Sequence, residues 1–481
     1  MTTLLDEIKK ETATVCTENG DTAFSTTFNA NLDFFASCGA LRYDQEEVRD
    51  KTRNAIREDE ETAILNILHL RDIRSGLGER DSFRTAFMEL FRKYPDHARC
   101  LIPAIPEYGR WDDLLMLIDE PAVISFITMQ LYDDVENMEQ GNPVSLCAKW
   151  MPSANTSSAT TRKLAKQLYA GMGITEKEYR KMLSALRGYI DILERHMSEK
   201  DYSFDYEKLP SKALMKHIKA FMRNDQTRYE AYLEALKTGE KRAKTGAVYP
   251  HEILMLEDGS LRESMWHDLE RHVGDTKTIV VRDGSGSMGW MSYGAYRNNS
   301  VTPLHIATAL AILFSEQLTG PFKNKFITFS SKPKLVDLSG CNTLEEKVEV
   351  CNRHTDCSNT DIMAVYKLLL KAEKKCDPKD WIEKIIIISD MQFDQGTQNV
   401  PTYEEAKKMF DKEGIPLPQI VFWNVSSRAD FPSTDLKNVR LVSGLSRYII
   451  DGILKDTSMD AVQFMMNELE KYRPALQLLR S

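Results

Sequence analysis

Two uninterrupted runs of apolar, mostly β-branched residues, at 278–281 and 385–388, place the strongest constraint on the fold of this chain. A strand that is apolar at every position is buried on both faces, as in a parallel sheet covered by helices. The first run leads into Asp-Gly-Ser-Gly-Ser at 283–287, and the second leads into Ser-Asp at 389–390. Because open α/β sheets bind ligands at the carboxyl ends of their strands, the two polar clusters predict a site at one edge of the sheet.

The rest of the last 200 residues alternates between strand and helix patterns. Thr302 followed by Pro303 predicts a helix start, and the apolar pattern after it continues to Gly320. Further strands are expected at 326–329, 420–423 and 439–442, with one helix from Thr402 and a closing helix after Met459. This alternation predicts a doubly wound, mainly parallel sheet.

The two polar clusters contain ligands suited to a hard divalent cation. Asp283, Ser285 and Ser287 place one carboxylate and two hydroxyls on a single turn, and the glycines between them let the turn close tightly. Thr360, at the start of an apolar helical stretch, and Asp390 add a hydroxyl and a carboxylate from two other loops. A Ser/Gly-rich turn alone is often only a turn, but oxygen ligands from three loops predict a Mg²⁺ or Mn²⁺ site.

This arrangement resembles the metal-ion-dependent adhesion site of von Willebrand factor A domains. The resemblance implies a bound metal with one open coordination position, which an Asp or Glu of a partner protein completes. The chain also carries an insertion at 290–301, directly after the Asp-x-Ser-x-Ser motif and rich in Tyr, Asn, Arg and Gly. We expect this insertion to overhang the metal and to affect how a partner reaches it.

Length and cysteine usage limit the organisation of the chain. At 481 residues it is too long for one ordinary core, and we predict a helical domain at 1–255, a linker at 256–275 and an α/β domain at 276–481. The eight cysteines form no C-x-x-C pair, which predicts reduced thiols, a cytoplasmic location and no structural zinc. No apolar stretch reaches the length of a membrane span, and the amino terminus lacks a signal-peptide core, so no membrane association is expected.

The first 250 residues show helical periodicity and little strand pattern. Apolar residues recur at helical spacing before and after a glycine-containing corner at 71–80, and further helices are indicated around 95–108, 111–118, 160–170 and 177–193. Helices joined by short corners predict an α-solenoid of the HEAT type. The corner is crowded with charge, for which we favour ion pairs that fix the turn over a functional role; its members are Arg71, Asp72, Arg74, Glu79 and Arg80.

The charge distribution indicates one localised basic region. The chain carries a net charge of −9, yet residues 151–250 contain 19 Lys and Arg against 12 Asp and Glu. In the segment after Pro210, four cations fall on one helical face, while Leu214, Ile218 and Phe221 fall on the opposite face. The four are Lys212, Lys216, Lys219 and Arg223, and Lys163 and Lys166 are candidates to extend the surface. We interpret these cations as a surface that binds RNA phosphates. The alternatives are an ordinary solvated helix face and a chance excess of positive charge in this part of the chain.

Several motifs resemble those of the Ro ribonucleoprotein family, in which a TROVE module of HEAT-like helices precedes a von Willebrand A domain. The resemblance is closest to a branch of that family found in plants, bacteria and phages. It implies a ring or horseshoe of helices closed by the A domain and a noncatalytic role in binding small non-coding or misfolded RNAs. The motifs are Leu-Arg-Asp-Ile-Arg at 70–74, Gly-Leu-Gly-Glu-Arg at 76–80, Glu-Tyr-Gly-Arg-Trp-Asp-Asp-Leu-Leu at 107–115, Ala-Lys-Trp-Met-Pro-Ser at 148–153, Val-Tyr-Pro-His-Glu-Ile at 248–253, Ser-Asp-Met-Gln-Phe-Asp at 389–394 and Val-Phe-Trp-Asn at 421–424.

Three function classes follow from these patterns. The leading expectation is a noncatalytic RNA-binding protein with a Mg²⁺-binding A domain, and the second is a protein–protein adaptor that captures a partner carboxylate on the metal. The third is a metal-dependent hydrolase built on Asp283, Asp390 and Asp394. The hydrolase is disfavoured because these motifs contain no general-base histidine and the chain carries no phosphate-binding G-x-x-x-x-G-K-[ST] loop.

Overall fold

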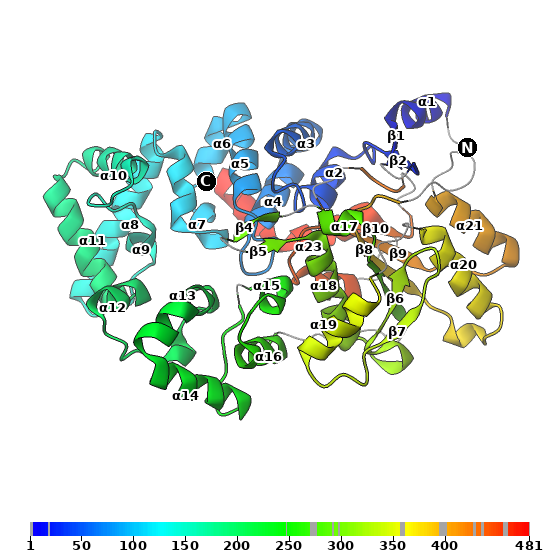
Figure 1. Cartoon of the computed structure of the whole chain (residues 1–481). Coiled ribbons are helices and arrows are strands. Elements are labelled where there is room, and N and C mark those ends of the chain that lie inside the picture. The colour runs from blue at the N-terminus through cyan, green and yellow to red at the C-terminus, as the bar shows by residue number, and fades with distance from the viewer. Residues whose placement is uncertain are drawn as a thin grey trace.

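The chain folds into a helical part followed by an α/β part (Figure 1). The computed structural model describes residues 3–17, 20–246, 248–269, 277–290, 293–296, 299–355, 361–393, 402–426, 430–433, 437–455 and 460–480. The predicted order, helices first and an α/β sheet afterwards, is therefore confirmed.

The helical part begins with helix α1, which is followed by a short antiparallel hairpin and then by helices of very unequal length. Several helices start at side chains that cap the free backbone N–H groups of the first turn: Asp44 before α3, Asp59 before α4 and Thr175 before α11. The elements are α1 (Leu4–Ala13), β1 (Thr14–Cys16), β2 (Thr22–Phe24), α2 (Ala30–Ser37), α3 (Gln45–Glu58), α4 (Glu60–Arg71), α5 (Asp81–Lys93), α6 (Pro95–Cys100), α7 (Ala104–Tyr108), η1 (Trp111–Leu117), α8 (Pro121–Glu139), α9 (Cys147–Trp150), α10 (Ala159–Gly171), α11 (Glu176–Ile190), α12 (Leu193–Glu199), η2 (Tyr206–Lys208), α13 (Ser211–Asn224), α14 (Gln226–Lys237), α15 (Pro250–Leu254) and α16 (Gly259–His267).

The α/β part is built on one six-stranded sheet with the order β10-β9-β8-β3-β6-β7. Neighbouring strands run parallel except β7, which pairs antiparallel to β6 at the sheet edge. The elements are β3 (Thr278–Asp283), α17 (Ser287–Trp290), β4 (Tyr293–Tyr296), β5 (Asn299–Val301), α18 (Pro303–Gln317), η3 (Gly320–Phe322), β6 (Lys325–Phe329), β7 (Leu335–Asp337), α19 (Leu344–Arg353), α20 (Ile362–Glu373), η4 (Pro378–Asp380), β8 (Lys384–Ser389), α21 (Thr402–Glu413), β9 (Gln419–Asn424), β10 (Val439–Ser443), α22 (Ile449–Lys455), α23 (Ala461–Leu469) and η5 (Glu470–Leu479).

The two strands that were predicted from continuous apolar runs, β3 and β8, lie side by side in the middle of this sheet and are buried at every residue. Crossover connections between parallel strands are right-handed. A connection that runs across the sheet in one direction therefore places its helix on one face, and a connection that runs in the opposite direction places its helix on the other face. Accordingly α18 lies on the face toward the helical part, and α20 and α21 lie on the opposite face (Figure 1). Thr302 caps α18 as predicted, by accepting a hydrogen bond from the His305 backbone.

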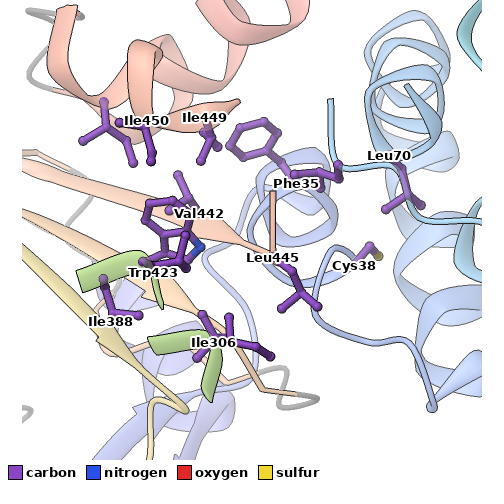
Figure 2. Close-up of a cluster of buried hydrophobic side chains, with 14 of the residues drawn as sticks. Phe35, Cys38, Leu70, Ile306, Ile388, Trp423, Val442, Leu445, Ile449 and Ile450 are labelled. Carbon is purple, nitrogen blue, oxygen red and sulfur yellow. The ribbon is translucent and has the colours of Figure 1, made fainter. Parts of the chain in front are cut away.

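The two ends of the chain pack together around one shared core. Helices α2 and α23 both contact β10, and η5 contacts α4 and α6. Figure 2 shows Phe35 of α2 and Leu70 of α4 in the same cluster as side chains from the sheet and its carboxyl-terminal helices, which are Trp423, Val442, Leu445, Ile449 and Ile450. Burial on this scale is the main stabilising term in folding, so the first helices belong to the core of the sheet.

A close backbone approach explains two glycines at this junction. Gly444 has φ +99, and a Cβ there would lie 3.2 Å from the Gly39 carbonyl oxygen. A Cβ on Gly39 would lie 2.7 Å from Leu77 Cδ1 and 2.9 Å from the Ser443 carbonyl oxygen. Ser443 Oγ adds hydrogen bonds, accepting from the Gly39 N–H and donating to the Phe35 carbonyl, both at 3.2 Å. Only glycine lets the two backbones come this close.

The charged corner at 71–80 is fixed by ion pairs and carbonyl contacts, as the sequence favoured. Arg71, only 2% exposed, pairs with the fully buried Asp113 at 2.7 Å. Arg42 pairs with the buried Glu79 at 2.6 Å, and Asp72 accepts hydrogen bonds from the backbone of Arg74 and Ser75. Each buried carboxylate therefore has a cationic or N–H partner, which such groups need in order to remain charged.

The segment predicted as a linker, 256–275, contains a folded helix. Helix α16 lies within it, and three of its side chains, Leu261, Met265 and Trp266, are buried. Helices α15 and α16 connect the helical part to α18 and α19 of the α/β part. Among the residues that the structure describes, no helix is both long enough and apolar enough to cross a membrane.

Candidate metal centre and basic helix

The predicted metal residues lie where the chain changes direction across the sheet. The connection that follows β3 leads to β6 on one side, and the connection that follows β8 leads to β9 on the other. The carboxyl ends of β3 and β8 therefore form the switch point of the sheet, which is the usual ligand site of open α/β sheets. Arg282 pairs with Ile388 in the register, so Asp283 and Ser389 end adjacent strands.

Asp283 is fully buried and held in one orientation by two hydrogen bonds. Its Oδ1 accepts from the Ser285 backbone N–H at 2.9 Å, and its Oδ2 accepts from Ser389 Oγ at 2.5 Å. Ser389 was not among the predicted site residues. The signal that could have found it is the alignment of the two apolar runs, which places Ser389 beside Asp283.

The other described residues of the predicted set gather at the same edge. Ser285 Oγ and Ser287 Oγ lie 3.0 Å apart, and Ser287 begins α17. Asp390 is 1% exposed, and its Oδ1 accepts a hydrogen bond from the Gln392 backbone at 3.2 Å. The residue between them, Met391, has φ +63, a left-handed conformation that is uncommon for a side chain of this type and makes the turn after β8 tight.

The electrostatics of this edge fit a divalent cation. Burial, followed by the charge of Asp390, raises the pKa of Asp283 to about 7. Two buried carboxylates that disfavour each other's ionisation are stabilised when a positive ion lies between them. Within the described residues no three His, Cys, Asp or Glu side chains cluster as metal ligands; the predicted set has only two carboxylates and otherwise relies on hydroxyl oxygens. This all-oxygen donor set fits Mg²⁺ or Mn²⁺.

Thr360, the fifth predicted ligand, lies outside the described residues, as does Asp394. The segments on either side of Thr360 are fixed. The fully buried Arg282 donates to the Cys351 carbonyl at 3.0 Å and to Thr355 Oγ1 at 2.9 Å, at the end of α19. On the other side, Asp361 caps α20 by accepting from the Ala364 N–H at 2.8 Å.

Contacts of the described residues place the end of the insertion and the amino-terminal segment. The insertion forms the antiparallel pair β4–β5, and its last residue, Val301, is buried and borders a cavity of about 260 Å³ between α13 and α15. At least this end of the insertion therefore lies toward the helical part; the predicted position over the metal stays a prediction. The amino-terminal segment also reaches the α/β part, where Thr17 Oγ1 donates to the Phe393 carbonyl at 2.7 Å.

The predicted basic helix is α13, and its two faces are divided as expected. Leu214 and Phe221 are fully buried, and Phe221 packs among the rings of Tyr206 and Tyr229. Three cations on the other face, Lys216, Lys219 and Arg223, are exposed, and among the described residues none of them forms an ion pair.

Lys212, at the start of the same row, differs from the other three cations because it has a carboxylate partner. Its Nζ forms an ion pair with Glu252 of α15 and lies 5.2 Å from the centre of the Tyr249 ring. The acid does not belong to α13 itself but comes from a helix 40 residues away. A phosphate at this end would have to displace Glu252.

Lys163 and Lys166 are exposed on α10. Figure 1 places α10 and α13 at separate points of the arc of helices. These two lysines are therefore a separate pair of surface cations, and they do not continue the row of cations on α13.

Comparison with known proteins defines the family of this chain. Residues 17–120 and 121–282, more than half of the chain, match the family described as Domain of unknown function (DUF2828). The chain belongs to the DUF2828 family. Residues 277–475 match a second family, described as Domain of unknown function (DUF7788), so the two matches overlap along the central strand β3. The described metal-edge residues Asp283, Ser285, Ser287 and Asp390 fall in the DUF7788 match of this DUF2828 chain.

One curated relative aligns over nearly the full length. It is "Uncharacterized protein L728" of Acanthamoeba polyphaga mimivirus, 29% identical over 516 aligned positions. The alignment covers 95% of this chain and 87% of the viral protein. The helical part and the α/β part of this DUF2828 chain are therefore matched together in one relative.

Proposed function

We propose that this chain is a noncatalytic, cytoplasmic RNA-binding protein. In this proposal a HEAT-like solenoid forms a ring with a von Willebrand A-type domain that holds Mg²⁺ or Mn²⁺. The observation that carries the RNA proposal is the row of Lys216, Lys219 and Arg223, exposed on α13 without carboxylate partners among the described residues. Ordinary solvated helix faces gain from pairing such cations with acids, whereas a phosphate backbone supplies the negative charge itself.

Contacts between distant residues support the ring. The arc from α5 to α14 starts after residues 77–79, and the chain returns to them at Tyr249, whose hydroxyl donates to the Leu77 carbonyl at 2.9 Å. Arg42, which is paired with Glu79, also lies 5.3 Å from the centre of the Tyr249 ring. The two ends of the arc are thus joined by a hydrogen bond and by a cation–π contact.

The test of the RNA proposal is the salt dependence of binding. Reversing Lys216 and Lys219 to Glu should weaken the binding of a structured RNA and reduce the slope of log K against log salt by about 0.7–0.9 for each lost phosphate contact. The matched control reverses Lys367 and Lys371, which are exposed four residues apart on α20. An unchanged slope in a folded Lys216→Glu/Lys219→Glu protein would leave α13 as a solvated face. The same reversal at Lys163 and Lys166 tests whether α10 also contacts RNA.

The second candidate function is a protein adaptor, and the metal edge favours it. Asp283 and Asp390 would hold the cation with the hydroxyls of Ser285, Ser287 and Thr360. A cation bound there supplies a position at which a partner carboxylate can coordinate. Ser389 would keep the Asp283 carboxylate in the orientation that ligation needs, by donating to its Oδ2.

Calorimetric titration tests the metal site. Mg²⁺ or Mn²⁺ should bind the wild-type protein, and Asp283→Ala should abolish the heat of binding. Ser389→Ala should give an intermediate loss, since it removes the orienting hydrogen bond but no ligand. Chelation should leave RNA affinity within about threefold, or about 0.7 kcal/mol, because the proposed RNA row lies on α13 and the metal edge on the sheet. Metal affinity unchanged by Asp283→Ala would rule out this site.

A further inference from the structure

A groove of about 940 Å³ lies on the helical arc, away from the metal edge and from the exposed row of α13. Its walls are α11, α12 and the residues 153–155, which follow α9. These residues belong to the Ala-Lys-Trp-Met-Pro-Ser motif at 148–153 and its continuation, to which no role has been assigned so far.

Two side chains of α11 hold that motif in place. The Tyr179 hydroxyl, fully buried, donates to the Pro152 carbonyl at 2.9 Å. Arg187 donates to the Ala148 carbonyl at 2.9 Å, to Ser153 Oγ at 2.8 Å and to the Met151 carbonyl at 2.6 Å. The motif is thereby held against α11, and its last residue, Ser153, lines the groove.

Arg187 also leaves a positive charge in the groove. Its three partners are two carbonyls and a hydroxyl, and no carboxylate among the described residues pairs with it. A guanidinium has five N–H donors, so two remain after these three bonds. Burial lowers the pKa of Arg187, as expected for a cation that has lost water without gaining a counter-ion.

The α11 side of the groove combines small residues with further cations. Ser184 and Ala185 line it and are exposed, so a ligand can approach the helix closely there, whereas the Arg195 guanidinium covers Gly188. Lys181 and Lys177 lie on α11 about one and two turns before Ser184. Both are exposed, and neither forms an ion pair among the described residues. Arg180 and Arg195 also line the groove, together with Glu194 and Glu199 on α12, so the ionised lining carries five cations and two anions.

We propose that this groove binds the phosphate backbone of single-stranded RNA. The proposal rests on the proposed RNA-binding function and assigns it a second contact surface, on α11 and α12 instead of α13. Arginine forks and lysine ammonium groups are the usual partners of phosphates. The hydroxyls of Ser184 and Ser198 and the amide of Asn155, which also line the groove, can hydrogen-bond ribose 2′-hydroxyls.

The test compares a groove variant with a matched control by fluorescence anisotropy of labelled oligo(U). In Lys177→Glu/Lys181→Glu both substitutions are exposed on α11, so the fold should be unaffected. The slope of log K against log salt should fall by about 1.4, at about 0.7 for each single-strand phosphate contact. Lys367→Glu/Lys371→Glu, the same charge change on α20, should match the wild type. Arg187→Lys, which keeps the charge but loses the fork, should weaken binding less than the double reversal.

Four outcomes would overturn the assignment, and they differ from one another. Wild-type protein that binds oligo(U) with a slope unchanged in Lys177→Glu/Lys181→Glu keeps the RNA function but removes it from this groove. Wild-type protein that binds neither oligo(U) nor structured RNA removes the proposed function itself. Competition by poly-Glu as strong as that by oligo(U) of equal charge would make the groove an acidic-peptide site. Equal affinity for oligo(dT) and oligo(U) would show that the 2′-hydroxyl does not contribute to binding and that the groove does not select RNA over DNA.

Discussion

The junction between the chain ends and the far side of the helical arc are stabilised in different ways. At the junction, α2 packs on β10 across 404 residues of sequence, through a buried apolar core and a close glycine contact. On the far side, α11 contacts α8, α9 and α10, α14 contacts α13 and α16, and rings cluster locally around Tyr206 and Phe221. The junction therefore joins residues that are far apart in sequence, whereas the arc is stabilised mainly by contacts between residues closer in sequence and presents exposed cations.

The largest expected effect that separates the two regions comes from removing one buried ring in each. Phe35→Ala at the junction and Phe221→Ala in the arc should each lower the free energy of unfolding by about 3–5 kcal/mol. Hydrogen exchange should distinguish them. Phe35→Ala should speed exchange in α4 and in β10 together, because the core is shared, while Phe221→Ala should act only on α11 to α14. Faster exchange of β10 in Phe221→Ala would show that the arc and the sheet open as one unit.

A smaller contrast is expected from two glycines with left-handed backbone. Gly444→Ala places a Cβ 3.2 Å from the Gly39 carbonyl oxygen, whereas Gly141→Ala, after α8, meets no atom within 4 Å. In both variants, strain in the left-handed backbone should lower the free energy of unfolding by about 1–2 kcal/mol. Overpacking should lower it by about 1–3 kcal/mol more in Gly444→Ala. Denaturant midpoints of the two variants measure the difference. Equal midpoints would mean that the two chain ends can move apart at no cost.

Acid should act on the junction through His69. This ring is 3% exposed and stacks on Phe35, and burial holds its pKa well below the usual value of 6.5, with Lys471 adding to the effect. Because the folded pKa is lowered, the stability that the neutral ring contributes is present above pH 6.5 and is lost as the pH falls below it. His69→Gln should flatten this part of the stability profile. Identical acid profiles for the two proteins would place the acid sensitivity elsewhere.

The smallest expected effect is local, in α12, and has the opposite sign. The His196 ring lies between Asp201, 2.9 Å from Nδ1, and Asp191, 2.7 Å from Nε2, and these hydrogen bonds raise its pKa. Its contribution is therefore full below pH 6.5 and is lost as the pH rises through the raised value. Limited proteolysis of residues 191–201 should quicken with rising pH in the wild type and should be fast at every pH in His196→Ala. Cleavage that does not change with pH would contradict this role.

The sequence predicted most of what depends on local pattern. The apolar runs located β3 and β8, the capping residues located the helix starts, and the strand ends located Asp283, Ser285, Ser287 and Asp390 at one edge. It did not predict contacts between residues that are far apart in sequence. Periodicity places Lys212 on the polar face of its helix, but it cannot state that Glu252 meets this side chain. Nor does any pattern in the first 250 residues indicate that α2 meets β10. Ser389 was missed for the same reason, since its role depends on the register between two strands.

The contact between α2 and β10 has a consequence for folding during synthesis on the ribosome. The Gly39 backbone is made 404 residues before Ser443, with which it bonds. At typical synthesis rates of about 5–20 residues per second, α2 must wait about 20–80 s for its partner strand to be made. During that interval Phe35 and its neighbours have no sheet to cover. Chaperones that shield apolar helices should therefore associate with the nascent chain early and leave only near termination.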